Sequence, residues 1–293
     1  MLRPLTLLPL ALCAATACGA QPEEAALPAP LSVSELRERD FTTTLTFERT
    51  LEETADFTAR LVSYPSDGLT VYAMVATPKT PKPEAGYPVV VANHGFHPDP
   101  PRYGITAEGV DSRPGDYYRS VPALYARRGY LVVMPDFRGH NRSEGIEFVT
   151  SPRSVDYYAQ DVLALLGGLS DIEEADMDNV FLWSHSMGGQ VSVRVLLVSD
   201  AFRGASFWST ANVRDRVSLV PEIATPMLLQ HGLHDETTPF TNTRQLLDAA
   251  LGDAQPVALF SYDDSAHFFG PAIRELAADR DANFFRSLRG ADQ

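Results

Sequence analysis

The chain has 293 residues, of which 44% are hydrophobic and 21% are charged, a composition typical of a globular protein with a large core. Asp and Glu number 38 against 24 Lys and Arg, which gives a formal net charge of −14. This charge argues against a nucleic-acid backbone or an anionic membrane surface as a partner, and the length allows one large domain or two small ones.

Residues 1–17 are typical of a secretory signal peptide. Arg3 supplies an early positive charge, an apolar run follows, and small residues precede Cys18. The run is shorter than the roughly 20 residues that span a bilayer. We therefore expect an exported protein of the bacterial cell envelope, periplasmic or membrane-anchored, or otherwise a secreted one. Both cysteines, Cys13 and Cys18, lie in this region, so no disulfide framework is expected in the folded part.

Cys18 has two interpretations. The stretch "ATAC" before Gly19 resembles the bacterial lipobox, in which the cysteine is lipidated and becomes the first mature residue, although Ala15 stands where leucine is usual. Cleavage after Ala17 by an ordinary signal peptidase would instead leave a free thiol. Residues 18–34, rich in Ala, Pro and Glu, are expected to form a flexible tether, so a lipid on Cys18 would be the only membrane contact.

Residues 35–293 are expected to form one folded domain with a strand-rich beginning. Apolar and polar side chains alternate in the first strands, which indicates antiparallel pairing, whereas later strands are continuously apolar and alternate with helices. This order predicts an α/β fold with a mostly parallel sheet of about eight strands and helices on both faces. The expected strands are 41–47, 57–64, 69–78, 89–95, 130–135, 180–183, 204–209, 226–232 and 257–262, and the expected helices are 115–128, 155–169, 187–198, 241–251 and 271–288.

Ser186, Asp235 and His267 each follow the end of an expected strand. Ligands of parallel sheets bind at the carboxyl ends of the strands, so we expect these side chains to meet there. The chain order Ser, Asp, His is that of α/β-hydrolases. A serine hydroxyl needs a base within hydrogen-bond reach, for which His267 is suited, and Asp235 would fix the tautomer of that imidazole. The predicted chemistry is acyl transfer through Ser186, which needs no cofactor.

The turn "SHSMGG" departs from the usual G-x-S-x-G pattern at its first glycine. Gly188 and Gly189 keep the crossing of strand and helix open, while Ser184 adds a hydroxymethyl group that we expect to be tolerated. The amide of Met187 should face the oxyanion of the transition state, and the second donor should be the amide of Phe96, or that of Gly95 if the register differs by one.

Few residues separate the strands where many such enzymes insert a lid, so no large cap domain is expected. The longer segment 96–116 should instead wall one side of the pocket. Tyr103 and Tyr117 are candidate substrate contacts, together with His94 beside the oxyanion loop, although loop aromatics often serve only packing.

Five stretches of the chain form a recognisable pattern: "HGF" at 94–96, "MPDFRGHNRSEG" at 134–145, "SHSMGG" at 184–189, "HGLHDETTP" at 231–239 and "SAHFF" at 265–269. Together they resemble the catalytic domain of the prolyl oligopeptidase family, and the resemblance covers residues 71–288. Bacterial esterases of the dienelactone hydrolase and acetyl xylan esterase type share much of the pattern. The resemblance implies an α/β-hydrolase fold, the roles already given to the three residues, and a structural role for the D-x-R-G motif at 136–139. The family's peptidases usually carry a β-propeller before the hydrolase domain, and about 50 strand-rich residues here cannot form one.

Several alternatives remain open from the sequence. Asp263 and Asp264 are rival acids beside His267, although a solvated turn is the simpler interpretation. A noncatalytic, surface-anchored binding lipoprotein on the same fold is a second functional hypothesis. Nothing in the sequence specifies an oligomeric state, and the expected substrate is a small ester or a short peptide. His185 and His140 are interpreted as packing or surface residues. A metal site is disfavoured for the possible ligand sets, which are His94 with His97 and His231 with His234 and Asp235.

Overall fold

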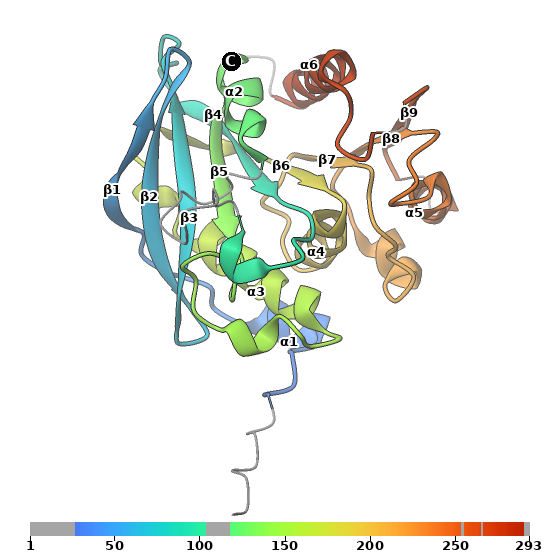
Figure 1. Ribbon diagram of the computed structural model, residues 1–293, viewed down its shortest axis with the longest axis horizontal. Coiled ribbons are helices and arrows are strands. Elements are labelled where there is room, and N and C mark those ends of the chain that lie inside the picture. The colour runs from blue at the N-terminus through green and yellow to red at the C-terminus, as the bar shows by residue number, and fades with distance from the viewer. Residues whose placement is uncertain (1–26, 104–117, 253–254, 265, 290–293) are drawn as a thin grey trace, which may run out of the picture.

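The computed structural model describes residues 27–103, 118–252, 255–264 and 266–289. One nine-stranded sheet runs through the molecule in the order β1-β2-β3-β5-β4-β6-β7-β8-β9 (Figure 1). The α/β fold is therefore confirmed, with nine strands where about eight were expected. The strands are β1 (Thr46–Glu53), β2 (Phe57–Ser66), β3 (Leu69–Pro78), β4 (Tyr87–Asn93), β5 (Leu131–Asp136), β6 (Ala175–His185), β7 (Gly204–Trp208), β8 (Met227–Gly232) and β9 (Val257–Tyr262).

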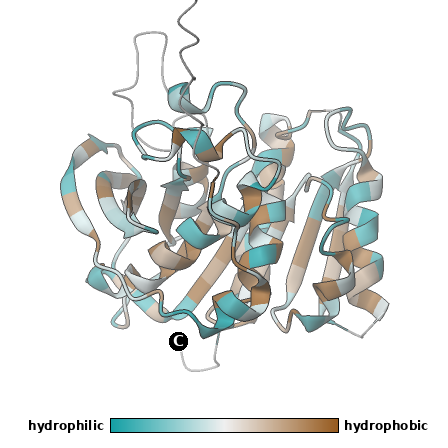
Figure 2. Ribbon diagram, turned by 90° about the horizontal axis from the view of Figure 1, so that it is seen from below, coloured by the Kyte–Doolittle hydropathy of each residue, from teal (hydrophilic) through white to brown (hydrophobic). Residues whose placement is uncertain are grey.

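The sheet has an antiparallel and a parallel part. Antiparallel pairing joins β1 to β2, β2 to β3 and β3 to β5. Parallel pairing joins the remaining neighbours, in the order β5, β4, β6, β7, β8 and β9. The carboxyl ends of the parallel strands consequently open at one edge of the sheet. Figure 2 shows hydrophobic residues along the strands and on the helix surfaces that face them.

Two hydrophobic cores cover the two faces of the sheet. Residues of β4 alternate between them: Val89 and Val91 belong to the core under α1, α3, α4 and α5, whereas Val90 and Ala92 belong to the core under α2 and α6. Burial on both faces explains why this strand is continuously apolar. The helices are α1 (Val33–Glu38), α2 (Ser120–Ala126), α3 (Ser154–Gly167), α4 (Met187–Leu196), α5 (Phe240–Gly252) and α6 (Pro271–Ser287), and the 3-10 helices are η1 (Pro100–Arg102), η3 (Ile146–Phe148), η4 (Leu169–Asp171) and η5 (Val217–Glu222).

Two expectations about the beginning of the fold are wrong. The strand predicted at 41–47 begins only at Thr46, because the preceding segment crosses α3, where the Thr43 hydroxyl donates to the carbonyl of Ala164 at 2.7 Å. The expected tether 18–34 overlaps α1, and the carbonyl of Pro28 accepts a hydrogen bond of 2.6 Å from the Tyr157 hydroxyl. The described part of that segment is therefore docked against the domain.

The connection between β7 and β8 contains only η5 as regular structure, which agrees with the expected lack of a large cap domain. The helix predicted at 115–128 is represented in the described residues by α2. None of the helices in the described parts of the chain is long and apolar enough to cross a membrane.

Candidate active site

The turn between β6 and α4 holds Ser186 in an unusual backbone conformation. Its φ of +56° and ψ of −122° are a strained combination for a residue with a side chain. The Ser186 amide donates to the carbonyl of Trp208 at 3.1 Å, and its carbonyl accepts the amide of Gly189 at 2.9 Å. The strain is thus held by hydrogen bonds on both sides of the turn, and the side chain is presented at the carboxyl end of β6.

Small residues make this turn possible. A Cβ atom on Gly188 would collide with the carbonyl of Asn93, and one on Gly189 would collide with the Thr210 side chain. Ser184 is fully buried, and its hydroxyl donates to the carbonyl of Ser206 at 3.3 Å. The hydroxymethyl group that replaces the usual glycine therefore fits between β6 and β7 with its polar atom satisfied.

Asp235 and His267 meet beyond the ends of β8 and β9. The Nδ1 atom of His267 lies 2.8 Å from Oδ2 of Asp235. The other carboxylate oxygen accepts the amides of Thr237 and Thr238 at 2.8 and 2.9 Å, and the Thr238 hydroxyl donates to Oδ2 at 2.9 Å. Because a carboxylate can only accept, Nδ1 of His267 carries the hydrogen, which leaves Nε2 as an acceptor in the neutral ring.

The same contacts keep Asp235 ionised. Burial alone would raise the pKa of its carboxyl group, but the hydrogen bonds from His267 and Thr238 outweigh burial and hold that pKa well below its usual range. The Asp235 side chain is completely buried, whereas that of His267 is 23% exposed. The acid is thus shielded while the imidazole remains accessible.

The two rival acids do not take part in this pair. Asp263 has an exposed side chain that lies 2.9 Å from His234, and Asp264 accepts the amides of Ala266 and Gly270. Both ring nitrogens of His231 are also occupied, by the Thr243 hydroxyl and the Thr238 carbonyl. Across the described parts of the chain, no group of three or more His, Cys, Asp or Glu side chains could hold a metal ion.

The loop after β4 lies directly against the turn that carries Ser186. The amide of Gly95 donates to the Tyr118 hydroxyl at 2.9 Å, so it is already engaged and is not the second oxyanion donor. A Cβ atom on Gly95 would lie 3.0 Å from Cβ of Ser186, which shows how closely the loop approaches. Phe96, the next residue, and Met187, the first residue of α4, both border the cavity that contains Ser186. These two amides are the candidate oxyanion donors.

Two of the expected substrate contacts are wrong. His94 and Tyr103 are both fully buried, with ring centroids 4.1 Å apart, and Phe137 stacks on the other side of His94 at 4.2 Å. They form the floor beneath the loop rather than a wall of the pocket. Tyr117 and Cys18 lie outside the described residues.

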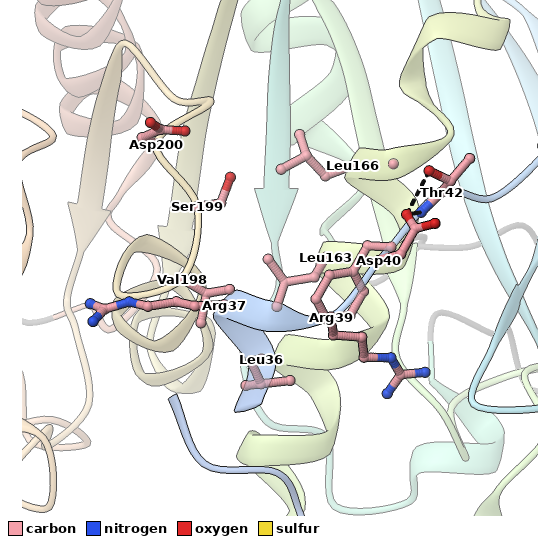
Figure 3. A pocket seen from close by; sticks show the side chains of 12 residues that line it. Leu36, Arg37, Arg39, Asp40, Thr42, Leu163, Leu166, Val198, Ser199 and Asp200 are labelled. Carbon is pink, nitrogen blue, oxygen red and sulfur yellow. Dashed lines mark hydrogen bonds between the residues drawn. The ribbon is translucent and has the colours of Figure 1, made fainter. Parts of the chain in front are cut away.

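The cavity beside Ser186 has a volume of about 500 Å³. Its lining is mixed, with apolar and charged side chains. A second hollow of about 340 Å³ lies between α1, the end of α3 and the segment after α4 (Figure 3). Helices α3 and α4 end where the parallel strands β6 and β7 begin, so this hollow lies at the amino edge of those strands, away from the candidate site. The first cavity is lined by Phe96, Pro152, Ser154, Val155, Ser186, Met187, Gln190, Arg194, Ala211 and Asp215.

The D-x-R-G motif forms a buried ionic cluster beneath the loop after β4. Arg138 contacts Asp161 through Nη2 at 2.7 Å and Asp67 through the same atom at 2.7 Å. Burial alone would lower the pKa of Arg138, but the Asp161 carboxylate outweighs it and raises that pKa. Phe137 of the motif stacks on His94, so the cluster supports the candidate oxyanion loop from below.

Similarity to known proteins identifies the family of this chain. Residues 89–291 match the alpha/beta hydrolase family, and the chain belongs to this family. The human acylamino-acid-releasing enzyme is 21% identical over 73% of this chain and 32% of its own length, so the chain spans about a third of that relative.

Solved structures of esterases and peptidases share the fold. Acetyl xylan esterase 1 from Thermoanaerobacterium sp. JW/SL YS485 is 16% identical with a TM-score of 0.63 and covers 90% of this chain and 95% of its own. Pyrococcus horikoshii acylaminoacyl peptidase is 19% identical with a TM-score of 0.65 and covers 82% and 43%. The resemblance to hydrolases of prolyl oligopeptidase and esterase type is thereby confirmed, and the noncatalytic hypothesis receives no support.

Sequence reasoning missed three residues of the site. Thr238 could have been found, because "DETT" is typical of an aspartate that accepts amides two and three residues later. Tyr118 and His185 contact each other across 67 positions of the sequence, and no local pattern indicates such a contact.

Proposed function

We propose that the chain is a serine hydrolase in which Ser186 is the nucleophile, His267 the base and Asp235 the acid that orients it. The observation that carries this proposal is the 2.8 Å hydrogen bond from His267 to Asp235 at the sheet edge where the strained turn presents Ser186. A base oriented in this way has the tautomer needed to remove a proton from a serine hydroxyl.

The mechanism follows from these positions. Oγ of Ser186 attacks the carbonyl carbon of the substrate as its proton passes to Nε2 of His267. The amides of Phe96 and Met187 donate to the oxyanion, each contributing about 3 kcal/mol. His267 then gives the proton to the leaving group, and water repeats the sequence to hydrolyse the acyl-enzyme.

We propose an ester of a small acyl group as the substrate, with a short peptide as the second candidate. The acetyl xylan esterase is matched over 95% of its length, whereas the peptidase is matched over 43%, which supports the esterase. The relationship to the acylamino-acid-releasing enzyme supports the peptide. The cavity of about 500 Å³ is within the size of sites for small molecules.

A panel of p-nitrophenyl esters of increasing chain length, beside aminoacyl and dipeptidyl anilides, tests this choice through kcat/KM. We expect the short esters to give the highest values and Ser186→Ala to remove turnover of every substrate. Higher values for anilides would select the peptidase, and equal rates for wild type and Ser186→Ala would contradict the serine mechanism.

We further propose export to the cell envelope with a lipid on Cys18, as the lipobox-like sequence suggests. Metabolic labelling with palmitate should mark the wild type and the matched control Cys13→Ala, but not Cys18→Ala. A free thiol on a soluble secreted product would support ordinary signal-peptidase cleavage instead.

A further inference from the structure

A chain of hydrogen bonds links the loop after β4 to the loop that carries His267. The amide of Gly95 donates to the Tyr118 hydroxyl at 2.9 Å, and this hydroxyl lies 2.8 Å from Nδ1 of His185. On the other side of the ring, Nε2 of His185 lies 2.8 Å from the carbonyl oxygen of His267. His185 directly precedes the proposed nucleophile. These hydrogen bonds therefore connect the loop after β4, the turn that carries Ser186 and the loop that carries His267.

The direction of every bond in this chain is determined. A carbonyl oxygen only accepts, so Nε2 of His185 carries a hydrogen. In the neutral imidazole Nδ1 then accepts, and the Tyr118 hydroxyl must donate to it. The hydroxyl oxygen remains to accept the amide of Gly95, so the contacts between these atoms are consistent only with the Nε2–H tautomer.

The surroundings keep His185 in this neutral form. Its ring is 2% exposed, and burial, followed by the nearby His267, lowers its pKa to about 3. Phe268 packs edge-on against the rings of both Tyr118 and His185, at centroid distances of 5.0 and 4.9 Å. Arg274 lies 4.5 Å above the Phe268 ring. The two polar side chains are therefore enclosed by packing that leaves them few other geometries.

We propose that Tyr118 and His185 are positioning residues of the hydrolase, which set the backbone of His267 and the peptide before the Phe96 oxyanion donor relative to Ser186. This inference rests on the proposed function. Neither side chain touches the reacting atoms. Their hydrogen bonds act by fixing the positions of the base and the oxyanion loop, and small displacements of such groups reduce the rate by large factors.

Tyr118→Phe tests the proposal because it removes a single hydroxyl. We expect kcat for p-nitrophenyl acetate to fall about 10- to 100-fold while KM changes by about twofold or less. The matched control is Tyr130→Phe, which removes a buried hydroxyl that donates to the Ala282 carbonyl, away from the site. That variant should lose thermal stability but keep kcat. Equal kcat in the two variants would overturn the proposal.

His185 offers a rescue experiment. His185→Phe keeps an aromatic ring but makes no hydrogen bond, whereas His185→Gln can donate to the His267 carbonyl and accept from Tyr118. We expect His185→Gln to keep a kcat about 10-fold higher than His185→Phe at similar melting temperatures. Equal losses in the two variants would show that the ring only fills space.

Nitrogen NMR of histidine-labelled protein separates this inference from the proposed function. We expect His185 to carry its hydrogen on Nε2 at neutral pH. A hydrogen on Nδ1 would overturn the proposed series of hydrogen bonds while leaving the serine mechanism intact. Hydrolysis that Ser186→Ala leaves unchanged would contradict the proposed function, and with it the positioning role, whatever the tautomer.

Discussion

Two buried carboxylates of this protein are bound in similar ways but serve different ends. Asp161 accepts the Ser66 hydroxyl at 2.7 Å, the Arg138 amide at 2.8 Å and the Arg138 guanidinium at 2.7 Å. Asp235 likewise accepts backbone amides, the Thr238 hydroxyl and a nitrogen-bearing side chain, that of His267.

The difference lies in the partner and in its exposure. Arg138 is 1% exposed and cannot lose its proton, so its pair with Asp161 is a permanent cross-link beneath the loop. His267 is 23% exposed, and its contact with Asp235 through Nδ1 leaves Nε2 as a proton acceptor, as the proposed proton transfer from Ser186 requires. A buried carboxylate thus marks a candidate reactive site only where its partner is accessible and has an atom that can accept a proton.

The largest expected effect is that of Asp235→Asn. The amide would donate to Nδ1 of His267 and force the wrong tautomer, so kcat should fall about 10⁴-fold while the protein stays folded. Steady-state hydrolysis of p-nitrophenyl acetate and circular dichroism measure the two quantities. Asp263→Asn, at the exposed rival acid, is the control and should keep full activity. More than a tenth of the wild-type kcat in Asp235→Asn would contradict the assignment.

Arg138→Met should show the opposite pattern. It leaves Asp161 buried without its cation, so the free energy of unfolding should fall by about 3–5 kcal/mol. Arg138→Lys keeps the charge and should lose less. Denaturant unfolding measures the loss, and kcat of the folded fraction should change far less than in Asp235→Asn. A stable Arg138→Met variant without activity would break the distinction between the two pairs.

The buried imidazole of His140 makes the free energy of unfolding depend on pH. It is 2% exposed, and burial lowers its pKa from 6.5 to about 4. Between about pH 6.5 and pH 4, His140 is protonated in the unfolded chain but neutral in the folded chain. The free energy of unfolding therefore falls as the pH drops through this range. Between pH 7 and pH 5, His140→Phe should lose about 2 kcal/mol less than the wild type. Identical losses in denaturant titrations at the two pH values would contradict this.

The smallest effect is expected for Ser184→Gly, which restores the usual glycine of the turn. Only the 3.3 Å hydrogen bond to the Ser206 carbonyl is lost, so stability should change by about 1 kcal/mol or less and kcat should stay near wild type. Unfolding and hydrolysis measured together test this. A loss of kcat greater than about 10-fold would give the Ser184 hydroxyl a role in the turn.

The sequence was sufficient to predict that Asp235 and His267 meet at the sheet edge. The buried strands β6, β8 and β9 are recognisable from their apolar runs, and the carboxyl ends of parallel strands lie together whatever the details of packing. Asp235 and His267 could therefore be paired before their contact was observed.

Other features depended on contacts that periodicity does not encode. His94 and Tyr103 look like loop residues, but they stack in the interior beneath the loop after β4. The beginning of β1 depends on where the chain crosses α3, through the bond from Thr43 to Ala164. The hydrogen bond from Tyr118 to His185 joins the segment before α2 to the end of β6, and only the tertiary fold brings these two together.

Fluorophosphonate labelling of the folded wild-type protein, followed by mass spectrometry of its peptides, tests the central claim most directly. Only a serine activated by a base reacts readily with this probe, so we expect one adduct, on Ser186, and none in Ser186→Ala or His267→Ala. An unlabelled wild-type protein, or an adduct on another serine, would contradict the proposed mechanism.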